Sequence, residues 1–278
     1  MSILKRSDNL SKVTLWLFLG LLLVRIPIIK SIEYFIHPLP GWMIQIFEVA
    51  MYLLIGILIF REKDNLVDYF IDKLSVVIFI LSSTILGFFV LFYEAPMYWI
   101  ALIFWGIAVS LIILLRKRRL NFEKIKADTY AWLFTGFTIG IFLSFFLAIP
   151  RYLALEEQFQ KSSHTIVYLF VLFLFSLVNQ FVHASVIEEF MFRGFLWGCL
   201  RKFGMADKWI LFVQAGLFWV AHINYIDRGY SFWVVVPLSG LVFGLLAWQS
   251  KSIATSMIAH SVVNAMTYVI FDVLAYLN

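Results

Sequence analysis

Three segments in the last 110 or so residues combine the side-chain types that amide hydrolysis requires. VIEEFMFRG (186–194), FWVAHINY (218–225) and AHSVVNAM (259–266) contribute, in that order, Glu188, Glu189, Arg193, His222, Asn224, His260 and Asn264. All of them lie in or beside apolar runs, where ionisable groups are costly and are functional candidates by default. A carboxylate base, a histidine that shares its proton and two donors for an oxyanion would suffice to hydrolyse an amide.

Helical spacing indicates which of these side chains can act together. Glu189 and Arg193 stand four residues apart on one helix face and can pair, whereas Glu188 is rotated by about 100°. A carboxylate facing a dry cavity is suited to be a general acid or base. The same four-residue spacing relates Phe218 to His222 and also relates His260 to Asn264, one turn apart.

Each motif taken singly also has a structural explanation. The charges of VIEEFMFRG could mark the water end of a span, and a lone histidine near a helix end is more often structural than catalytic. His260 and Asn264 could form a helix–helix hydrogen bond, the common use of such groups in membranes. His183, five residues before Glu188, is predicted to pack or to form a hydrogen bond. It is the combination of the three motifs that favours a hydrolytic site.

The composition predicts that these segments belong to a multi-pass membrane protein. Of the 278 residues, 63% are hydrophobic and only 14% are charged, too few to cover the surface of a soluble domain. The net charge of +5 is expected from basic cytoplasmic loops, so no nucleic-acid partner is inferred. A single cysteine, Cys199, excludes an internal disulfide and a CxxC motif.

Apolar runs long enough to cross a bilayer predict an all-α fold with eight or nine transmembrane helices. The candidate spans are residues 13–29, 42–60, 74–93, 97–115, 130–149, 166–187, 209–225, 231–248 and 253–274. The basic N-terminal segment and the first apolar run are not followed by a small-residue cleavage site, so this span is expected to be retained.

The distribution of basic residues predicts a cell-membrane protein with a cytoplasmic N-terminus. With that orientation, 17 of the 22 lysines and arginines lie inside, 4 lie outside, and Arg25 lies within the first span. The RKRR run at 116–119 is interpreted as a topology anchor, with an acidic-lipid or nucleic-acid patch as the alternative.

Depth along the helices tests whether the three motifs can meet. At about 1.5 Å per residue, His222, His260 and Asn264 would lie roughly 13 to 21 Å from the cytoplasmic face. Glu188 would share that depth only if its helix runs inward to Arg201 and Lys202, beyond the apolar run that ends at residue 187. The spans of residues 1–165 are expected to contain no polar cluster, so residues 166–278 are predicted to form the functional core and residues 1–165 have no assigned role.

The motifs EEFMFRG (188–194), FWVAH (218–222) and HSVVN (260–264) closely resemble those of the type II CAAX endopeptidase and bacteriocin-processing family, the CPBP or Abi intramembrane proteases. The resemblance covers roughly residues 166–274. It implies that Glu188 is the water-activating base and that His222 helps to hold and polarise the water. It further implies that His260 and Asn264 stabilise the oxyanion, while Glu189 and Arg193 support the site, with Phe218 beside His222. The implied substrate is a membrane-embedded or lipidated peptide, for example a prenylated CAAX-type or a bacteriocin- or signal-peptide-like one.

The metal content of the predicted site has two interpretations. Zinc could be held by Glu188, His222 and His260 in a His₂Glu set that leaves one position for water. The sequence has no HExxH motif, and zinc would occupy the base and the oxyanion donors as ligands. The interpretation adopted requires no cofactor, and the zinc-dependent protease is kept as the alternative.

Two further classes of function compete with this interpretation. A rhomboid-type serine protease would use Ser239 of PLSGLVFG with His260, but Pro237 stands where that motif has its first glycine. Ser239, Gly240 and Gly244 are better explained as small residues that permit close helix packing. A non-catalytic membrane protein of the same fold, such as an immunity factor, a scaffold or a transporter, is the other alternative.

Overall fold

The computed structural model describes residues 12–23, 41–93, 98–122, 128–155 and 165–277, and this part of the chain is all helical, without a strand. The first helices are α1 (Lys12–Leu23), α3 (Gly41–Arg61), the 3₁₀ turn η2 (Leu66–Tyr69), α4 (Lys73–Tyr93), α5 (Tyr98–Arg116) and α6 (Thr129–Leu155). One long continuous helix follows, made of α7 (Ile166–Gln180), the π segment η4 (Phe181–Ser185), α8 (Val186–Glu188), the π segment η5 (Glu189–Leu196) and α9 (Trp197–Lys202). The chain then forms α10 (Asp207–Val220), η6 (Ile223–Tyr225), the π segment η7 (Ser231–Val235), α11 (Val236–Ser250) and α12 (Ile253–Leu277).

Within the described residues, five helices are long and apolar enough to cross a membrane. They span Lys73–Phe92, Tyr98–Arg116, Thr129–Ala148, Ile166–Lys202 and Ser231–Ser250. The all-helical, multi-pass character predicted from the sequence is therefore confirmed.

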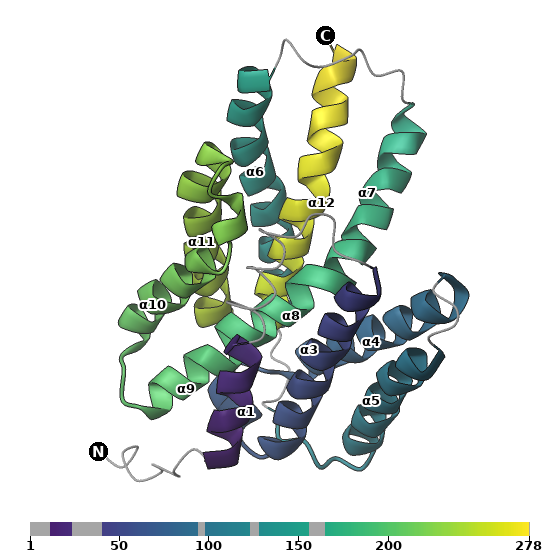
Figure 1. Cartoon of the computed structure of the whole chain (residues 1–278). Coiled ribbons are helices and arrows are strands. Elements are labelled where there is room, and N and C mark those ends of the chain that lie inside the picture. The colour runs from purple at the N-terminus through teal and green to yellow at the C-terminus, as the bar shows by residue number, and fades with distance from the viewer. Residues whose placement is uncertain (1–11, 24–40, 94–97, 123–127, 156–164, 278) are drawn as a thin grey trace.

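The prediction that the sixth span ends near residue 187 is wrong. The helix continues from Ile166 to Lys202, has 37 residues and changes direction between α7 and α8 (Figure 1). The charges at 188, 189 and 193 do not end the span, because the fold supplies partners for them and they need not reach water. This continuation was the condition for Glu188 to share the depth of the two histidines.

Two groups of helices pack on the long helix from different sides (Figure 1). Helices α1, α3, α4 and α5 contribute most of the larger apolar core together with α8, η5 and α9, and a few residues of α10, α11 and α12 join it. A smaller core joins α6, α11 and α12 through Leu143, Leu147, Phe243, Leu246, Ala259 and Val263. The long helix thus lies between the N-terminal helices and the C-terminal ones.

Glycines set the close approach of α6 to α12. A Cβ on Gly136 would lie 2.6 Å from the carbonyl oxygen of Thr255, and one on Gly140 would lie 2.9 Å from that of Ala259. Neither backbone could move aside cheaply, so both positions require glycine. This contact fixes the backbone of α12 at Thr255 and Ala259, in the part of the helix that leads to His260.

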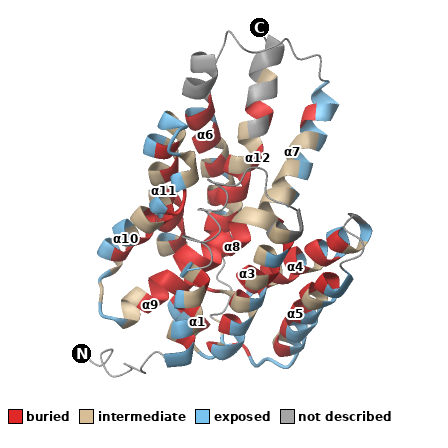
Figure 2. Ribbon diagram, viewed as in Figure 1, coloured by how far each residue is buried: buried red, intermediate tan, exposed pale blue. Residues whose placement is uncertain are grey.

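Burial is concentrated at the middle of the long helix (Figure 2). Every residue from Ser185 to Cys199 is buried, whereas most of α7 is exposed or intermediate. The exposed side chains of α7 are large and apolar, including Val167, Phe170 and Phe175. They suit a lipid environment, while the charged motif lies in the protein interior.

Candidate active site

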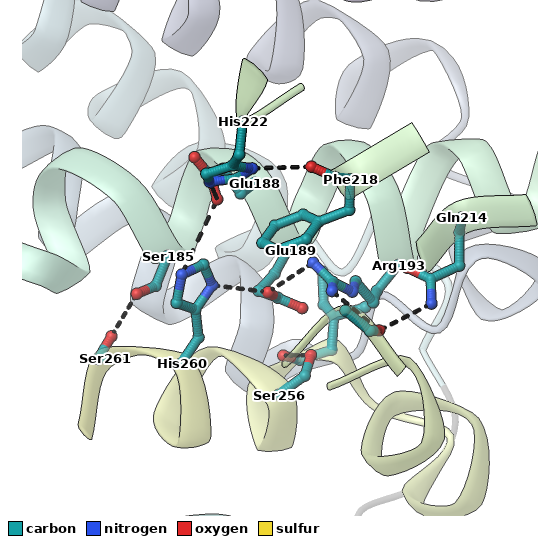
Figure 3. Close-up of polar contacts among 12 residues, drawn as sticks. Ser185, Glu188, Glu189, Arg193, Gln214, Phe218, His222, Ser256, His260 and Ser261 are labelled. Atoms are coloured by element: carbon teal, nitrogen blue, oxygen red, sulfur yellow. Dashed lines mark hydrogen bonds and ion pairs between the residues drawn. The ribbon is translucent and has the colours of Figure 1, made fainter. Parts of the chain in front are cut away.

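Glu188, His222 and His260 converge from three different elements (Figure 3). Glu188 is the last residue of α8, His260 lies on α12, and the Oε2 atom of Glu188 is 3.8 Å from Nε2 of each histidine. All three residues are nearly enclosed, with 3%, 9% and 4% of their surfaces exposed. The arrangement therefore gathers one carboxylate and two imidazoles in a site almost closed to bulk solvent.

His222 lies beyond the end of its helix, whereas the sequence predicted a helix over 209–225. Helix α10 ends at Val220, and His222 occupies the turn before η6. Its Nδ1 atom is 2.8 Å from the carbonyl oxygen of Phe218, and the two rings are 4.5 Å apart. Because a carbonyl only accepts, Nδ1 must carry a proton, and the Nε2 atom faces Glu188.

The second histidine is held between the two adjacent glutamates. Nδ1 of His260 is 2.9 Å from Oε1 of Glu189, while its Nε2 atom faces Glu188. The ring also stacks on Phe243, with the centroids 4.8 Å apart. A carboxylate on Nδ1 favours a proton there, and Nε2 of His260 also faces Glu188.

Glu189 and Arg193 form an ion pair of 3.0 Å, and both side chains are completely buried. The guanidinium also donates to the carbonyl oxygen of Gly240 at 3.2 Å and lies 4.3 Å from the centroid of the Phe218 ring. Phe218 therefore touches Arg193 on one side and His222 on the other. These contacts hold the ring nitrogens of both histidines in place through Glu189 and Phe218.

Gln214 is a supporting residue that the sequence analysis missed. Its Nε2 atom donates to the carbonyl oxygen of Gly240 at 3.0 Å, the same oxygen that accepts from Arg193. Cβ atoms on Gly240 and Gly244 would lie 3.3 Å from Ala215 and 2.2 Å from the Gln214 amide. The interpretation of these glycines as packing residues is confirmed. A polar residue in an apolar helix was the available signal for Gln214, but its partner is a backbone atom and leaves no motif.

Asn264 lies one turn beyond His260 on α12, as its spacing predicts. Its amide donates to Oε1 of Gln180 at 2.8 Å, a contact between α12 and α7 that the sequence did not indicate. An amide nitrogen has two hydrogens, so one can still be donated elsewhere. A second polar contact of α12, this one with η4, joins Ser261 to Ser185 at 2.8 Å.

Asn224 and Ser239 both have a buried side-chain oxygen without a hydrogen-bond partner among the described residues. Ser239 is therefore not bonded to His260, and a serine–histidine dyad is not assembled. Asn224 lies in η6, two residues after His222.

The prediction that the spans of residues 1–165 hold no polar cluster is wrong. On α3, Glu48 pairs with Nδ1 of His183, and Tyr52 donates its hydroxyl to the carbonyl oxygen of Val182 at 2.6 Å. Gln45 on the same helix is also buried. Their spacing puts them on one face of α3, but nothing in the sequence indicates that this face meets the long helix. The hydrogen bond predicted for His183 is confirmed.

The residues around Glu188 were tested for their fit to zinc. No group of three or more His, Cys, Asp or Glu side chains in the described segments has an arrangement that could hold a metal ion. The donor types and the hydrogen bonds on both Nδ1 atoms nevertheless match those of catalytic His₂Glu zinc sites. The donors fit zinc in kind, although their spacing does not match a formed metal site.

Residues 162–266 match a family model described as type II CAAX prenyl endopeptidase Rce1-like. The matched segment includes all three motifs, and the resemblance predicted from them is thereby confirmed over this range. Comparisons with curated proteins and with solved structures gave no match.

Proposed function

We propose, from this family match and the geometry around Glu188, that the chain is an intramembrane endopeptidase in which Glu188 activates water to hydrolyse a peptide bond. The observation that carries the proposal is the 3.8 Å separation of the Glu188 carboxylate from both imidazole Nε2 atoms. A water about 2.8 Å from both Oε2 and one Nε2 atom can bridge such a gap.

Attack on the peptide carbonyl follows from this placement. Glu188 takes a proton from the water, and the hydroxide oxygen bonds to the carbonyl carbon, whose π electrons move to the oxygen. Protonated His260, whose Nδ1 proton is held by Glu189, donates from Nε2 to that oxyanion, and Asn264 donates its second amide hydrogen. The proton taken by Glu188 then passes to the leaving nitrogen as the C–N bond breaks. His222 polarises the attacking water through Nε2.

Three residues act by positioning the two histidines and not by contact with the substrate: Glu189, Arg193 and Phe218. Glu189 orients His260, and the Phe218 carbonyl orients His222. Arg193 balances the charge of Glu189, and both side chains are completely buried. These three residues are expected to set the geometry of the site without touching the substrate.

A zinc-dependent version of the same protease is the second candidate. It is favoured by one observation, the hydrogen bonds that direct both Nε2 atoms toward Glu188. Glu188, His222 and His260 would hold the ion. Bound zinc would lower the pKa of a coordinated water and polarise the peptide carbonyl. The residues around the site would keep the roles described above.

The substrate class and membrane arrangement are part of the proposal. The buried site inside an apolar helix bundle suits a membrane-embedded or lipidated peptide, prenylated or otherwise, and we propose no nucleic-acid partner. We propose eight or nine spans in the cell membrane and a cytoplasmic N-terminus, in line with the 17 basic residues on the inner side.

The test compares purified wild type with Glu188→Gln in detergent on fluorogenic prenylated and unlipidated membrane-anchored peptides. Glu62→Gln is the matched control, since Glu62 is also buried but pairs with Lys202 at the far end of the long helix. Cleavage by wild type and the control, reduced at least 100-fold in Glu188→Gln, would support the base. Equal cleavage by all three would refute it. Loss of wild-type activity with a strong chelator, restored by zinc, would favour the zinc version. Cleavage by none of them would favour the non-catalytic alternative.

A further inference from the structure

Helix α3 presents a polar face to the long helix just before the proposed base. Gln45, Glu48 and Tyr52 recur at intervals of three and four residues and therefore share one side of α3. Two of them contact consecutive residues of the π segment η4, Val182 and His183. Since polar side chains inside membrane helices are costly, two such contacts at one turn indicate a specific purpose.

The Tyr52 contact stabilises an irregular turn of the helix. Tyr52 is fully buried, and its hydroxyl donates to the carbonyl oxygen of Val182 at 2.6 Å. Wide π turns depart from the regular hydrogen-bond ladder, and a side-chain donor inserted into the ladder fixes where that departure occurs. A membrane offers no water to replace such a donor.

The second contact fixes the next residue. The Glu48 carboxylate pairs with Nδ1 of His183, and the edge of the same imidazole approaches Phe89 of α4, with the ring centroids 6.5 Å apart. Residues 182 and 183 are thus held from the side of α3 and α4. On α12, Ser261 holds Ser185.

The held turn lies close to Glu188. Glu188 is the fifth residue after His183, about 8 Å along the helix, and no glycine or proline lies between them. All residues from Ser185 to Glu188 are buried, so the short segment cannot bend independently of its neighbours. A shift of the turn at Val182 must therefore move the Glu188 carboxylate relative to His222 and His260.

We propose that α3 positions the proposed base, with Tyr52 and Glu48 as positioning residues for Glu188, and this rests on the proposed function. The N-terminal helices are then part of the catalytic apparatus, although the family match begins only at residue 162. These helices do not touch the substrate. They fix the position of one π turn, and that turn sets the position of the Glu188 carboxylate.

The kinetic test compares Tyr52→Phe with Tyr69→Phe in the full-length protein. Tyr69 is also fully buried and packs on the long helix, but at Gly198, ten residues beyond Glu188, where its hydroxyl accepts from Lys202. Tyr52→Phe should lower kcat for a cleaved peptide about tenfold or more and leave KM within about twofold, because only the base is displaced. Tyr69→Phe should leave kcat within about twofold. Glu48→Gln, which keeps the side-chain size, should change kcat in the same direction as Tyr52→Phe.

A second readout requires no substrate. Cysteines at Ser185 and Ser261, whose hydroxyls are 2.8 Å apart, should cross-link readily under oxidation after Cys199→Ala removes the native thiol. Adding Tyr52→Phe should slow this cross-linking severalfold, and adding Tyr69→Phe should not.

The two readouts separate failure of this inference from failure of the proposed function. Unchanged cross-linking, a Tyr52→Phe kcat within twofold of wild type, or an equal kcat loss in Tyr69→Phe would overturn the positioning role. If wild type cleaves no peptide, the proposed function fails, and the cross-linking rate alone decides whether α3 sets the turn.

Discussion

Replacing Arg193 by methionine should strongly destabilise the protein, because it leaves Glu189 as a buried carboxylate without its cation. The arginine and glutamate side chains are completely buried and 3.0 Å apart. Breaking a buried pair in this way costs about 3–5 kcal/mol. Loss of the hydrogen bond from Arg193 to the Gly240 carbonyl adds little to this cost, since the carbonyl retains its hydrogen bond from Gln214. The contact with Phe218 changes from cation–π to sulfur–aromatic, a loss of about 1 kcal/mol or less.

The double variant Arg193→Met with Glu189→Gln isolates the charge effect. A neutral pair of similar volume in place of a buried ion pair is often nearly neutral in stability, so the double variant should lie within about 2 kcal/mol of wild type. Glu189→Gln alone should be destabilising, like Arg193→Met alone. The free energies of unfolding would be measured in bicelles by steric trapping. The control is Arg201→Met, whose ion pair with Asp207 is partly exposed and should contribute about 1 kcal/mol or less.

Two results would refute this reasoning. One is a cost below about 1 kcal/mol for Arg193→Met, which would mean that Glu189 does not depend on the arginine. The other is a double variant whose destabilisation equals the sum of the two single ones, which would mean that the two charges are not coupled.

Three further predictions concern packing, pH and the serine alternative. Gly140→Ala should destabilise the protein by about 1–3 kcal/mol in the same unfolding assay, because the added Cβ would meet the α12 backbone. The control is Gly106→Ala, whose Cβ would have nothing within 4 Å and should not destabilise the protein. Burial raises the pKa of Glu62, but hydrogen bonds from Thr14, Asn65 and Tyr69 and the charge of Lys202 outweigh it and lower that pKa below 4.5. The charged Glu62 therefore stabilises the fold fully above pH 4.5, and this stabilisation is lost as the pH falls through the lowered pKa. Glu62→Gln should flatten the dependence of thermal stability on pH in that range. An unchanged pH profile would contradict this prediction. Ser239→Ala should cleave peptides at the wild-type rate, and loss of cleavage would reinstate a serine nucleophile.

The helices and the polar motifs were predictable because each has a local signal. Apolar runs marked most of the helices to within a few residues, and the spacing of Glu189 and Arg193 anticipated their ion pair. The end of the sixth span was not predictable in this way. Three charges in nine residues normally reach water, and only the tertiary partners of Glu188, Glu189 and Arg193 allow the helix to continue.

The contacts between distant elements were not predictable for the same physical reason. Glu48 and Tyr52 share one face of α3, and Gln214 stands alone in α10. Their partners are a distant imidazole and backbone carbonyls. A backbone carbonyl has no residue signature. The three π segments also have no sequence pattern that distinguishes them from α-helix. Such features emerge only when the helices are packed together.

Because the first half of the long helix is exposed, we expect the geometry of the site to depend on the thickness of the bilayer. Helix α7 has large apolar side chains directed outward, such as Phe170 and Phe175, and continues unbroken to Glu188. Helix α7 and η4 have 15 and 5 residues, together about 30 Å at the α-helical rise, which equals a hydrocarbon thickness of about 30 Å. A thinner or thicker bilayer is accommodated by tilting or by local deformation of the bilayer. Since α7 leads directly into η4, the lipid chains that set its tilt also act on the turn that precedes Glu188. The length of the surrounding acyl chains is thereby coupled to the position of a carboxylate that they never touch.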